Sequence, residues 1–259
     1  MGGRGTRSGG PPAGGGGGFG VGVGGALGGV GPQAAPPTVQ PGQPVPAITQ
    51  AQLQAMDDDQ FVAYLNGLKS TPIDSNTYYN SNWDTQRLVA NMPELNMAPD
   101  VVDPQTFASL PGESLFRTVN AEGKDSAIDI CSRTMASDVT TIGGGRMGDG
   151  FYFANDLSHS QTNYGKTRNN ISKTATMEIK LNSNAKVVNE IQLKRMFDKE
   201  SDSVKGAILT MDTGAGQWMY SGLTAYALKK GYNVVRSSSY VNIIDRRAAT
   251  WSGNVIPWS

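Results

Sequence analysis

The chain of 259 residues contains one cysteine and one histidine. Cys131 alone cannot form an intrachain disulfide, so the sequence gives no sign of an oxidising compartment. A zinc site of the usual ligand types needs several Cys or His side chains, and we therefore expect no metal. Because nothing in the sequence sets an acid beside His159, the pattern favours a surface or supporting histidine over a Ser-His-Asp triad.

The chain also lacks a surplus of charge and a long apolar run. Arg4 and Arg7 are the only charges before Asp57, and the rest carries 20 basic and 22 acidic residues. This balance argues against bulk nucleic-acid binding, which needs a basic surplus. With no run of 18 apolar residues and an N-terminus too polar for a signal peptide, we expect neither a membrane span nor secretion.

Glycine and proline are instead concentrated at the N-terminus. Seventeen of the 33 glycines lie in residues 1–32, and eight of the 14 prolines precede residue 47. Such a segment buries too little apolar surface to offset the entropy of ordering it. We therefore predict disorder for residues 1–47, which leaves about 210 residues for one sizeable core.

Residues 48–111 have the pattern of a small helical lead-in. Thr49 and Gln52 resemble a capping box, and apolar residues then recur at helical spacing as far as Gly67. The acidic run 57–59 has the composition of a cation site, but the sequence favours a solvated helix cap. Two further helices are expected at 84–92, ended by Pro93, and from Asp103, where Pro104 takes the first helical position with Phe107 and Leu110 facing inward.

From residue 112 onward, short strands mix with helices. In residues 175–181 apolar and polar side chains alternate, which predicts a half-buried strand. Other strands are expected at 115–119, 151–153, 186–188, 233–236 and 240–244, and helices at 126–135, 191–197 and 217–230. The mixture favours an α+β fold over a doubly wound parallel sheet. Cys131 falls on the apolar side of its helix and is expected to be a buried core thiol.

Two glycine motifs are set aside. Gly165-Lys166-Thr167 resembles the end of a phosphate-binding loop, but the glycine required five residues earlier is Ser160. The run 143–145 is more typical of a flexible loop than of a phosphate nest.

The most informative segment is Gly148-Asp149-Gly150-Phe151-Tyr152-Phe153-Ala154, followed by Ser158-His159-Ser160 and Tyr164. Glycines let the backbone approach a ligand closely, and the aromatic run favours a strand. Hydroxyls at a helix start offer donors to an amide or a phosphate. The spacing therefore predicts a concave, aromatic wall rich in donors.

This segment resembles the diphtheria-toxin and poly(ADP-ribose) polymerase branch of the ADP-ribosyltransferase superfamily. There Gly-x-Gly-Ile-Tyr-Phe-Ala precedes Ser-x-Ser and a Tyr that lies one residue closer. Leu115-Phe116-Arg117 resembles the first strand of the bacterial-toxin branch, which carries Arg in place of His. The resemblance covers residues 112–250, and the chain is also similar to proteins encoded in gut bacteriophage genomes.

The resemblance implies a split mixed or antiparallel β-sandwich of the ADP-ribosyltransferase type, with residues 112–259 as the catalytic domain. It implies mono-ADP-ribosyl transfer from NAD to a protein acceptor, with release of nicotinamide and without a metal. The partner would be that acceptor or a larger assembly such as a phage particle. The location would be the host cytoplasm or the virion.

The resemblance also implies roles for single residues. Arg117 would contact the NAD phosphates or ribose, and Tyr152 and Tyr164 would sandwich the nicotinamide ring. Ser160 would form a hydrogen bond with the nicotinamide carboxamide, and Gly150 would let the backbone come close to the ligand. A surface ion pair for Arg117 and plain core packing for the tyrosines stay open as alternatives. The full implied NAD-binding set is Arg117, Thr118, Gly150, Tyr152, Phe153, Ser158, Ser160 and Tyr164.

One departure from the family is important. Active members usually carry a Glu in the last strands, and here that position falls on Tyr240, with Asn242 and Asp245 as nearby substitutes. The implied catalytic set is thus Arg117, Tyr240, Asn242 and Asp245. Without the Glu we do not expect chain elongation. Mono-transfer, or a catalytically silent module that binds or belongs to a virion, are the alternatives.

Overall fold

A computed structural model describes eight stretches of the chain: residues 35–38, 44–71, 83–120, 126–135, 147–148, 150–164, 174–211 and 220–257. All of them belong to one compact unit, Gln33–Ser259. Most of the segment for which disorder is predicted, residues 1–34 and 39–43, lies outside the described residues. Val45 is 4% exposed and packs in the core, so the core reaches into that segment.

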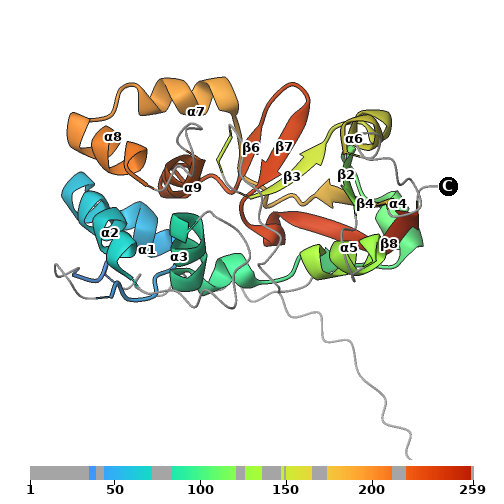
Figure 1. The fold of residues 1–259 in the computed structure, drawn as a ribbon, viewed down its shortest axis with the longest axis horizontal. Helices are drawn as coiled ribbons and strands as arrows, with labels where there is room; N and C mark the ends of the chain where they lie inside the picture. Colours follow the sequence, from blue (N-terminus) through green and yellow to red (C-terminus); the bar gives the residue numbers. More distant parts are fainter. Residues whose placement is uncertain are drawn as a thin grey trace, which may run out of the picture. The chain divides into compact units, whose positions relative to one another are not determined.

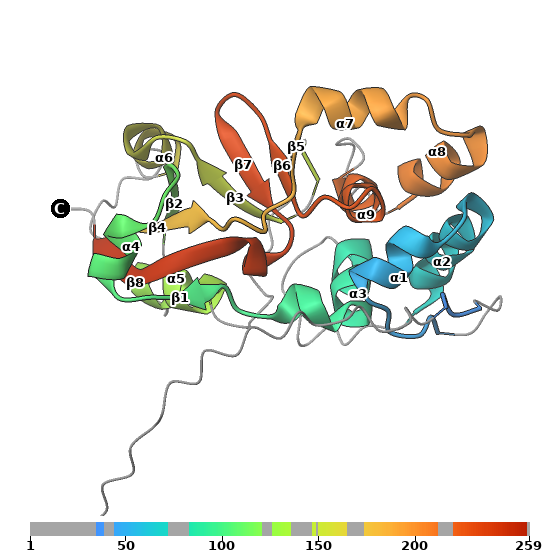
Figure 2. The same cartoon turned by 180° about the vertical axis from the view of Figure 1, so that it is seen from behind.

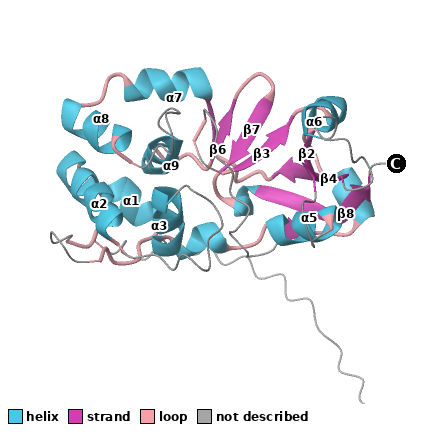
Figure 3. Ribbon diagram, viewed as in Figure 1, coloured by secondary structure: helices cyan, strands magenta, loops and turns pink. Residues whose placement is uncertain are grey.

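The fold is α+β, which confirms the predicted class, and the described residues form one mixed sheet of eight strands (Figure 3). Its order is β1-β8-β4-β2-β3-β7-β6-β5. The outermost pairs, β1 with β8 and β5 with β6, are parallel, and the pairs between them are antiparallel. The strands are β1 Asp100–Val101, β2 Ser114–Asn120, β3 Phe151–Ala154, β4 Thr174–Leu181, β5 Val187–Asn189, β6 Val234–Arg236, β7 Tyr240–Ile243 and β8 Ala249–Pro257.

The sheet is weakly joined between β2 and β3. Among the described residues, Phe116 with Ala154 is the one registered pair between these strands. By contrast, β2 pairs with β4 along its whole length, and β3 pairs with β7 along its whole length. The sheet therefore consists of two well-paired halves, and we call the junction between β2 and β3 the seam.

The helices form two groups (Figures 1 and 2). Both views show α6 and α5 on opposite sides of the half that contains β2 and β4, and α1–α3 beside α8 and α9. The helices are α1 Gln50–Ala55, α2 Asp58–Ser70, α3 Trp83–Asn91, α4 Pro104–Ser109, α5 Ala127–Met135, α6 Leu157–Tyr164, α7 Glu190–Phe197, α8 Asp202–Leu209 and α9 Tyr220–Lys229, with 3₁₀ turns η1 Pro93–Asn96 and η3 Arg246–Ala248.

The predicted first helix is in fact two helices. The Thr49–Gln52 capping box is present at α1, as predicted. Asp57 then begins α2 with a second box, accepting the Gln60 N–H at 2.8 Å. The Asp57 side chain accepts from a backbone N–H in the first turn of α2. A new helix therefore begins at this point, and α1 ends before it. The acidic run is thus an exposed cap, as expected.

The helices of the expected lead-in share a core with the C-terminal helices. Lys229 of α9 donates to the Met56 carbonyl and, at 3.3 Å, to that of Gln54, at the end of α1. Its ammonium lies 5.8 Å from the centroid of the Phe61 ring. A cation at a helix C-terminus meets the negative end of the helix dipole, which joins α1 to α9. The boundary predicted at residue 112 stays a prediction.

The prediction that β4 is half-buried is wrong. Thr176 is fully buried and Lys180 is 8% exposed, because helices cover both faces of the strand. Lys180 donates to the carbonyls of Phe107 at 3.1 Å and Leu110 at 2.9 Å, at the end of α4. Polar residues that alternate along a strand can therefore face buried hydrogen-bond partners as well as solvent.

The helix α8 and the strands β1 and β8 were not anticipated. Gly206 lies inside α8 and lowers its helical propensity. Gly253 interrupts β8 with a φ of +74°, which breaks the alternating pattern.

Candidate functional site

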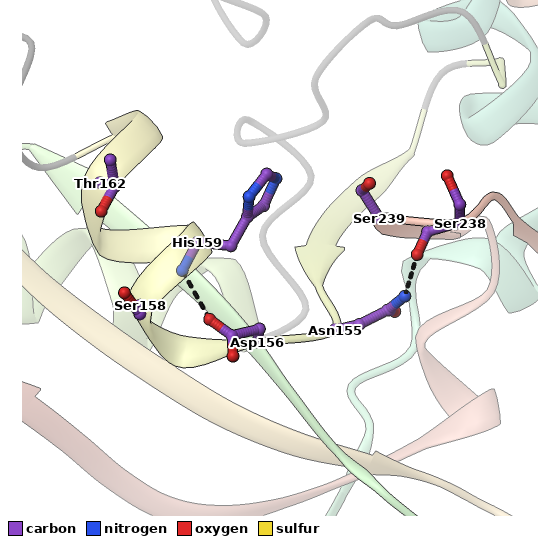
Figure 4. Close-up of a pocket in the computed structure, with 7 residues that line it drawn as sticks. All are labelled: Asn155, Asp156, Ser158, His159, Thr162, Ser238 and Ser239. Carbon is purple, nitrogen blue, oxygen red and sulfur yellow. Dashed lines mark hydrogen bonds between the residues drawn. The ribbon is translucent and has the colours of Figure 1, made fainter.

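An open pocket of about 480 Å³ lies between the first turn of α6 and the turn that joins β6 to β7 (Figure 4). Asp156 begins α6 by accepting the His159 N–H at 2.7 Å. Asn155 donates from its side chain to the Ser238 carbonyl at 2.9 Å, and from its backbone to that of Ser239 at 3.2 Å. These bonds hold the two walls together. The lining residues are Asn155, Asp156, Ser158, His159, Thr162, Ser238 and Ser239.

The pocket is lined by hydroxyls, amides and one imidazole, with Asp156 as a charged member. A bare phosphate prefers cationic or backbone N–H partners, so this lining suits polar, neutral groups such as sugar hydroxyls better. Ser158, expected at the NAD site, is exposed in this lining.

His159, Tyr240 and Asn163 form a hydrogen-bonded group at the pocket edge, which we call the rim cluster. His159 Nε2 lies 2.9 Å from Tyr240 Oη. Asn163 Nδ2 lies 2.9 Å from the same Oη and 2.9 Å from His159 Nε2. An amide nitrogen only donates, so a ring nitrogen that binds it is an acceptor. Asn163 Nδ2 also lies 3.4 Å from His159 Nδ1, so the roles of the two ring nitrogens depend on the tautomer. In the tautomer with the ring proton on Nδ1, the lone pair of Nε2 can accept from the Tyr240 hydroxyl or from the Asn163 amide.

Strand register decides which expected site residues share a face. Ala154 pairs with both Phe116 and Tyr240, and directly paired residues lie on the same face. Alternation along each strand then brings further residues to this face, which α6 covers. Four expected site residues lie there: Thr118, Tyr152, Tyr240 and Asn242.

Thr118 and Ser160, both expected at the NAD site, bind each other. Ser160 Oγ accepts the Thr118 N–H at 3.0 Å and lies 2.9 Å from Thr118 Oγ1. Thr118 Oγ1 lies 2.8 Å from Thr176 Oγ1. All three residues are at most 3% exposed. This buried network joins α6 to β2 and β4.

Arg117 lies on the opposite face of β2, because it is the neighbour of Thr118. Its charge acts on Cys131 of α5, where burial raises the pKa of the thiol to about 12 and Arg117 opposes that rise. Cys131 is fully buried, which confirms the expected core thiol. The structure therefore does not bring the Arg117 side chain to Ser160.

The glycine–aromatic segment has internal partners. A Cβ at Gly150 would lie 2.2 Å from Asn242 Oδ1 and 2.8 Å from the Ile243 carbonyl, so neighbouring β7 already requires glycine there. Tyr152 donates its hydroxyl to the Gly148 carbonyl at 2.6 Å and accepts the Met147 N–H at 3.1 Å. These bonds close the turn before β3. Phe153 is 1% exposed and belongs to the core rather than to the pocket.

Of the three expected substitutes for the Glu, Tyr240 contacts a residue of the pocket lining, His159. Asn242 is fully buried and donates to the carbonyls of Met147 and Gly148, each at 3.2 Å. Asp245, beyond the other end of β7, forms an ion pair with Arg247 at 2.7 Å. Tyr164 is the last residue of α6, and its side chain lies outside the described residues, as do the runs 143–145 and 165–167.

Sequence reasoning missed the rim cluster and the serine turn. Asp156 and the serines of residues 237–239 carried a visible signal, since Asp and Ser are typical of caps and turns. The contact between His159 and Tyr240 joins positions 81 residues apart, which no local pattern reveals.

Among the described residues, no group of three or more His, Cys, Asp or Glu side chains is placed to hold a metal ion. Within the same stretches, no helix has the length and apolar character needed to cross a membrane. Comparisons of the chain with family models, curated proteins and solved structures find no match.

Proposed function

We propose that this chain is a mono-ADP-ribosyltransferase that transfers ADP-ribose from NAD to a protein acceptor and releases nicotinamide. The seam carries the proposal. Thr118 and Tyr152 each lie two residues from the pair that joins β2 to β3, and Ser160 binds Thr118. A sheet divided at this place supports the split sandwich of the ADP-ribosyltransferase type, which is part of the proposal.

The reaction depends more on how the dinucleotide is positioned than on acid or base groups. Nicotinamide leaves an oxocarbenium-like ribose carbon, and a site that holds the folded dinucleotide and stabilises developing charge lowers that barrier. In the proposal, the carboxamide replaces the bond between the Thr118 N–H and Ser160 Oγ. Tyr152, with Tyr164, stacks on the ring. Arg117 lies on the opposite face of β2, beside α5, so it makes no contact with the dinucleotide in this proposal.

Incubation of the purified chain with radiolabelled NAD tests this function. We expect nicotinamide release and labelling of the chain or of a host lysate. Ser160→Ala should lower release by roughly 100-fold, because it removes the hydroxyl that positions the carboxamide at Thr118. Arg195→Ala, at an exposed position in α7, is the control and should leave release unchanged. No release by the unaltered chain, or equal release by Ser160→Ala, would overturn the proposal.

The buried hydroxyl network favours a second candidate, a catalytically silent module that binds a partner or belongs to a phage particle. Ser160, Thr118 and Thr176 satisfy one another without a ligand, and Tyr240 stands where a Glu is usual. Such a module should show no NAD-dependent change in melting temperature. A ligand that binds only the native state at 100 times its Kd adds about 2.7 kcal/mol, so a clear rise with NAD would exclude this candidate.

A further inference from the structure

The rim cluster has the arrangement of an activated nucleophile. The Tyr240 hydroxyl lies 2.9 Å from His159 Nε2, and in the tautomer that carries the ring proton on Nδ1 this nitrogen can accept the phenolic proton. A hydroxyl is a weak nucleophile until an adjacent base takes its proton. We propose that Tyr240 is an acceptor for ADP-ribose, with His159 as its base, so that the chain modifies itself. This inference rests on the proposed function and names its acceptor.

Asn163 stabilises the product of the proton transfer. Its side-chain N–H reaches Tyr240 Oη at 2.9 Å, and a hydrogen bond to a charged oxygen is stronger than one to a neutral hydroxyl. The two rings pack at a centroid distance of 5.0 Å and a tilt of 55°, which holds the imidazole beside the phenol. The backbone bond from His159 to Asp156 fixes the turn that carries the imidazole.

The placement of Tyr240 fits an acceptor. It is half-buried, follows Ser239 of the pocket lining, and begins β7. Through Ala154 it shares a face with Phe116, at the seam where the proposed dinucleotide binds. Its hydroxyl therefore lies on the side of the sheet that carries Tyr152, next to an open pocket.

The transfer balances without another reactant. Tyr240 Oη bonds to C1′ of the nicotinamide ribose, and the bond from this C1′ to the nicotinamide nitrogen breaks. Its electron pair stays on that nitrogen, which changes from a cationic pyridinium to neutral nicotinamide. The phenolic proton passes to His159 Nε2. The products are O-ADP-ribosyl tyrosine, nicotinamide and a protonated imidazole that returns its proton to solvent.

Mass spectrometry of the full chain after incubation with NAD tests the inference. We expect the intact mass to rise by one ADP-ribosyl group, and peptide mapping to place it on Tyr240. Tyr240→Phe should lose the modification, and His159→Gln should slow it about 100-fold, within the usual range for a general base. Tyr232→Phe, a change at another half-buried tyrosine, should be modified like the unaltered chain.

The outcomes separate this inference from the proposed function. Nicotinamide release with the label on another residue, or equal labelling of Tyr240→Phe, overturns the role of Tyr240 and leaves the transferase proposal standing. No nicotinamide release overturns both. Mapping of the unaltered chain does not depend on any variant, and melting temperatures of the variants report whether they fold.

Discussion

At the scale of single residues, a buried arginine connects three parts of the chain. Arg246 is 1% exposed and donates to the carbonyls of Thr134 at 2.9 Å and Asn96 at 3.2 Å. Its guanidinium carbon lies 4.9 Å from the centroid of the Phe151 ring. A planar group with several donors can serve the ends of α5 and η1 together, which a lysine could not do with the same geometry.

Arg246→Met should therefore destabilise the fold by about 3 kcal/mol, because it leaves one buried and one part-buried carbonyl without their donor. Urea denaturation followed by circular dichroism measures this. Arg195→Met in α7 is the control and should change stability by less than about 0.5 kcal/mol, since that residue is exposed. A loss of less than about 1 kcal/mol for Arg246→Met would contradict the assigned role.

At the scale of elements, α9 packs on α8 through a glycine. A Cβ at Gly222 would lie 2.2 Å from the Ile208 carbonyl and 2.6 Å from its side chain. Backbone cannot move aside as a flexible side chain can, so the two helices approach closely only because this position has no side chain. By contrast, a Cβ added at Gly206, inside α8, would have no neighbouring heavy atom within 4 Å.

The two glycines should respond in opposite directions to alanine. We expect Gly222→Ala to destabilise by about 2 kcal/mol through overpacking. Gly206→Ala should stabilise by roughly 0.5–1 kcal/mol, because alanine has the higher helix propensity and loses less backbone entropy. Thermal melting of both variants measures these changes in stability. A loss of stability in Gly206→Ala would show that α8 is packed more tightly than the structure indicates.

At the scale of the whole molecule, Glu200 links the segment between α7 and α8 to α9. It accepts from Tyr226 Oη at 2.7 Å and pairs with Lys230 at 2.7 Å. Burial acts to raise the pKa of Glu200, but hydrogen bonds from Lys230 and Tyr226 outweigh it and lower the pKa below the usual 4.5. The same burial, with the bond to Glu200, raises the pKa of Tyr226.

A carboxyl whose folded pKa is lowered stabilises the fold fully above its unfolded pKa and loses that contribution as pH falls through the folded value. In urea denaturation, the unaltered chain should therefore have a higher free energy of unfolding than Glu200→Gln above about pH 4.5. This difference should become smaller as the pH falls below 4.5. Gln192→Ala, at an exposed and uncharged position in α7, is the control and should show no such narrowing. A gap that stays constant with pH would contradict the ion-pair role of Glu200.

Much of the local structure could be predicted from the sequence. Asp103 caps α4 with Pro104 in its first turn, as expected, and the α+β class is confirmed. The site was predicted less well. Tyr240 contacts His159 of the pocket lining, whereas Asp245 is bound by Arg247 and Phe153 is in the core. Side chains that look available in a motif can be occupied by partners distant in sequence.

By itself, the sequence determined where several helices begin and which strands exist around the aromatic segment. These depend on caps, propensities and the period of two, which act over a few residues. Only the tertiary structure decided that Thr118 and Ser160 close on each other and that Arg117 faces α5. It also brought His159 to Tyr240 across 81 residues, because strand order and helix placement set such contacts.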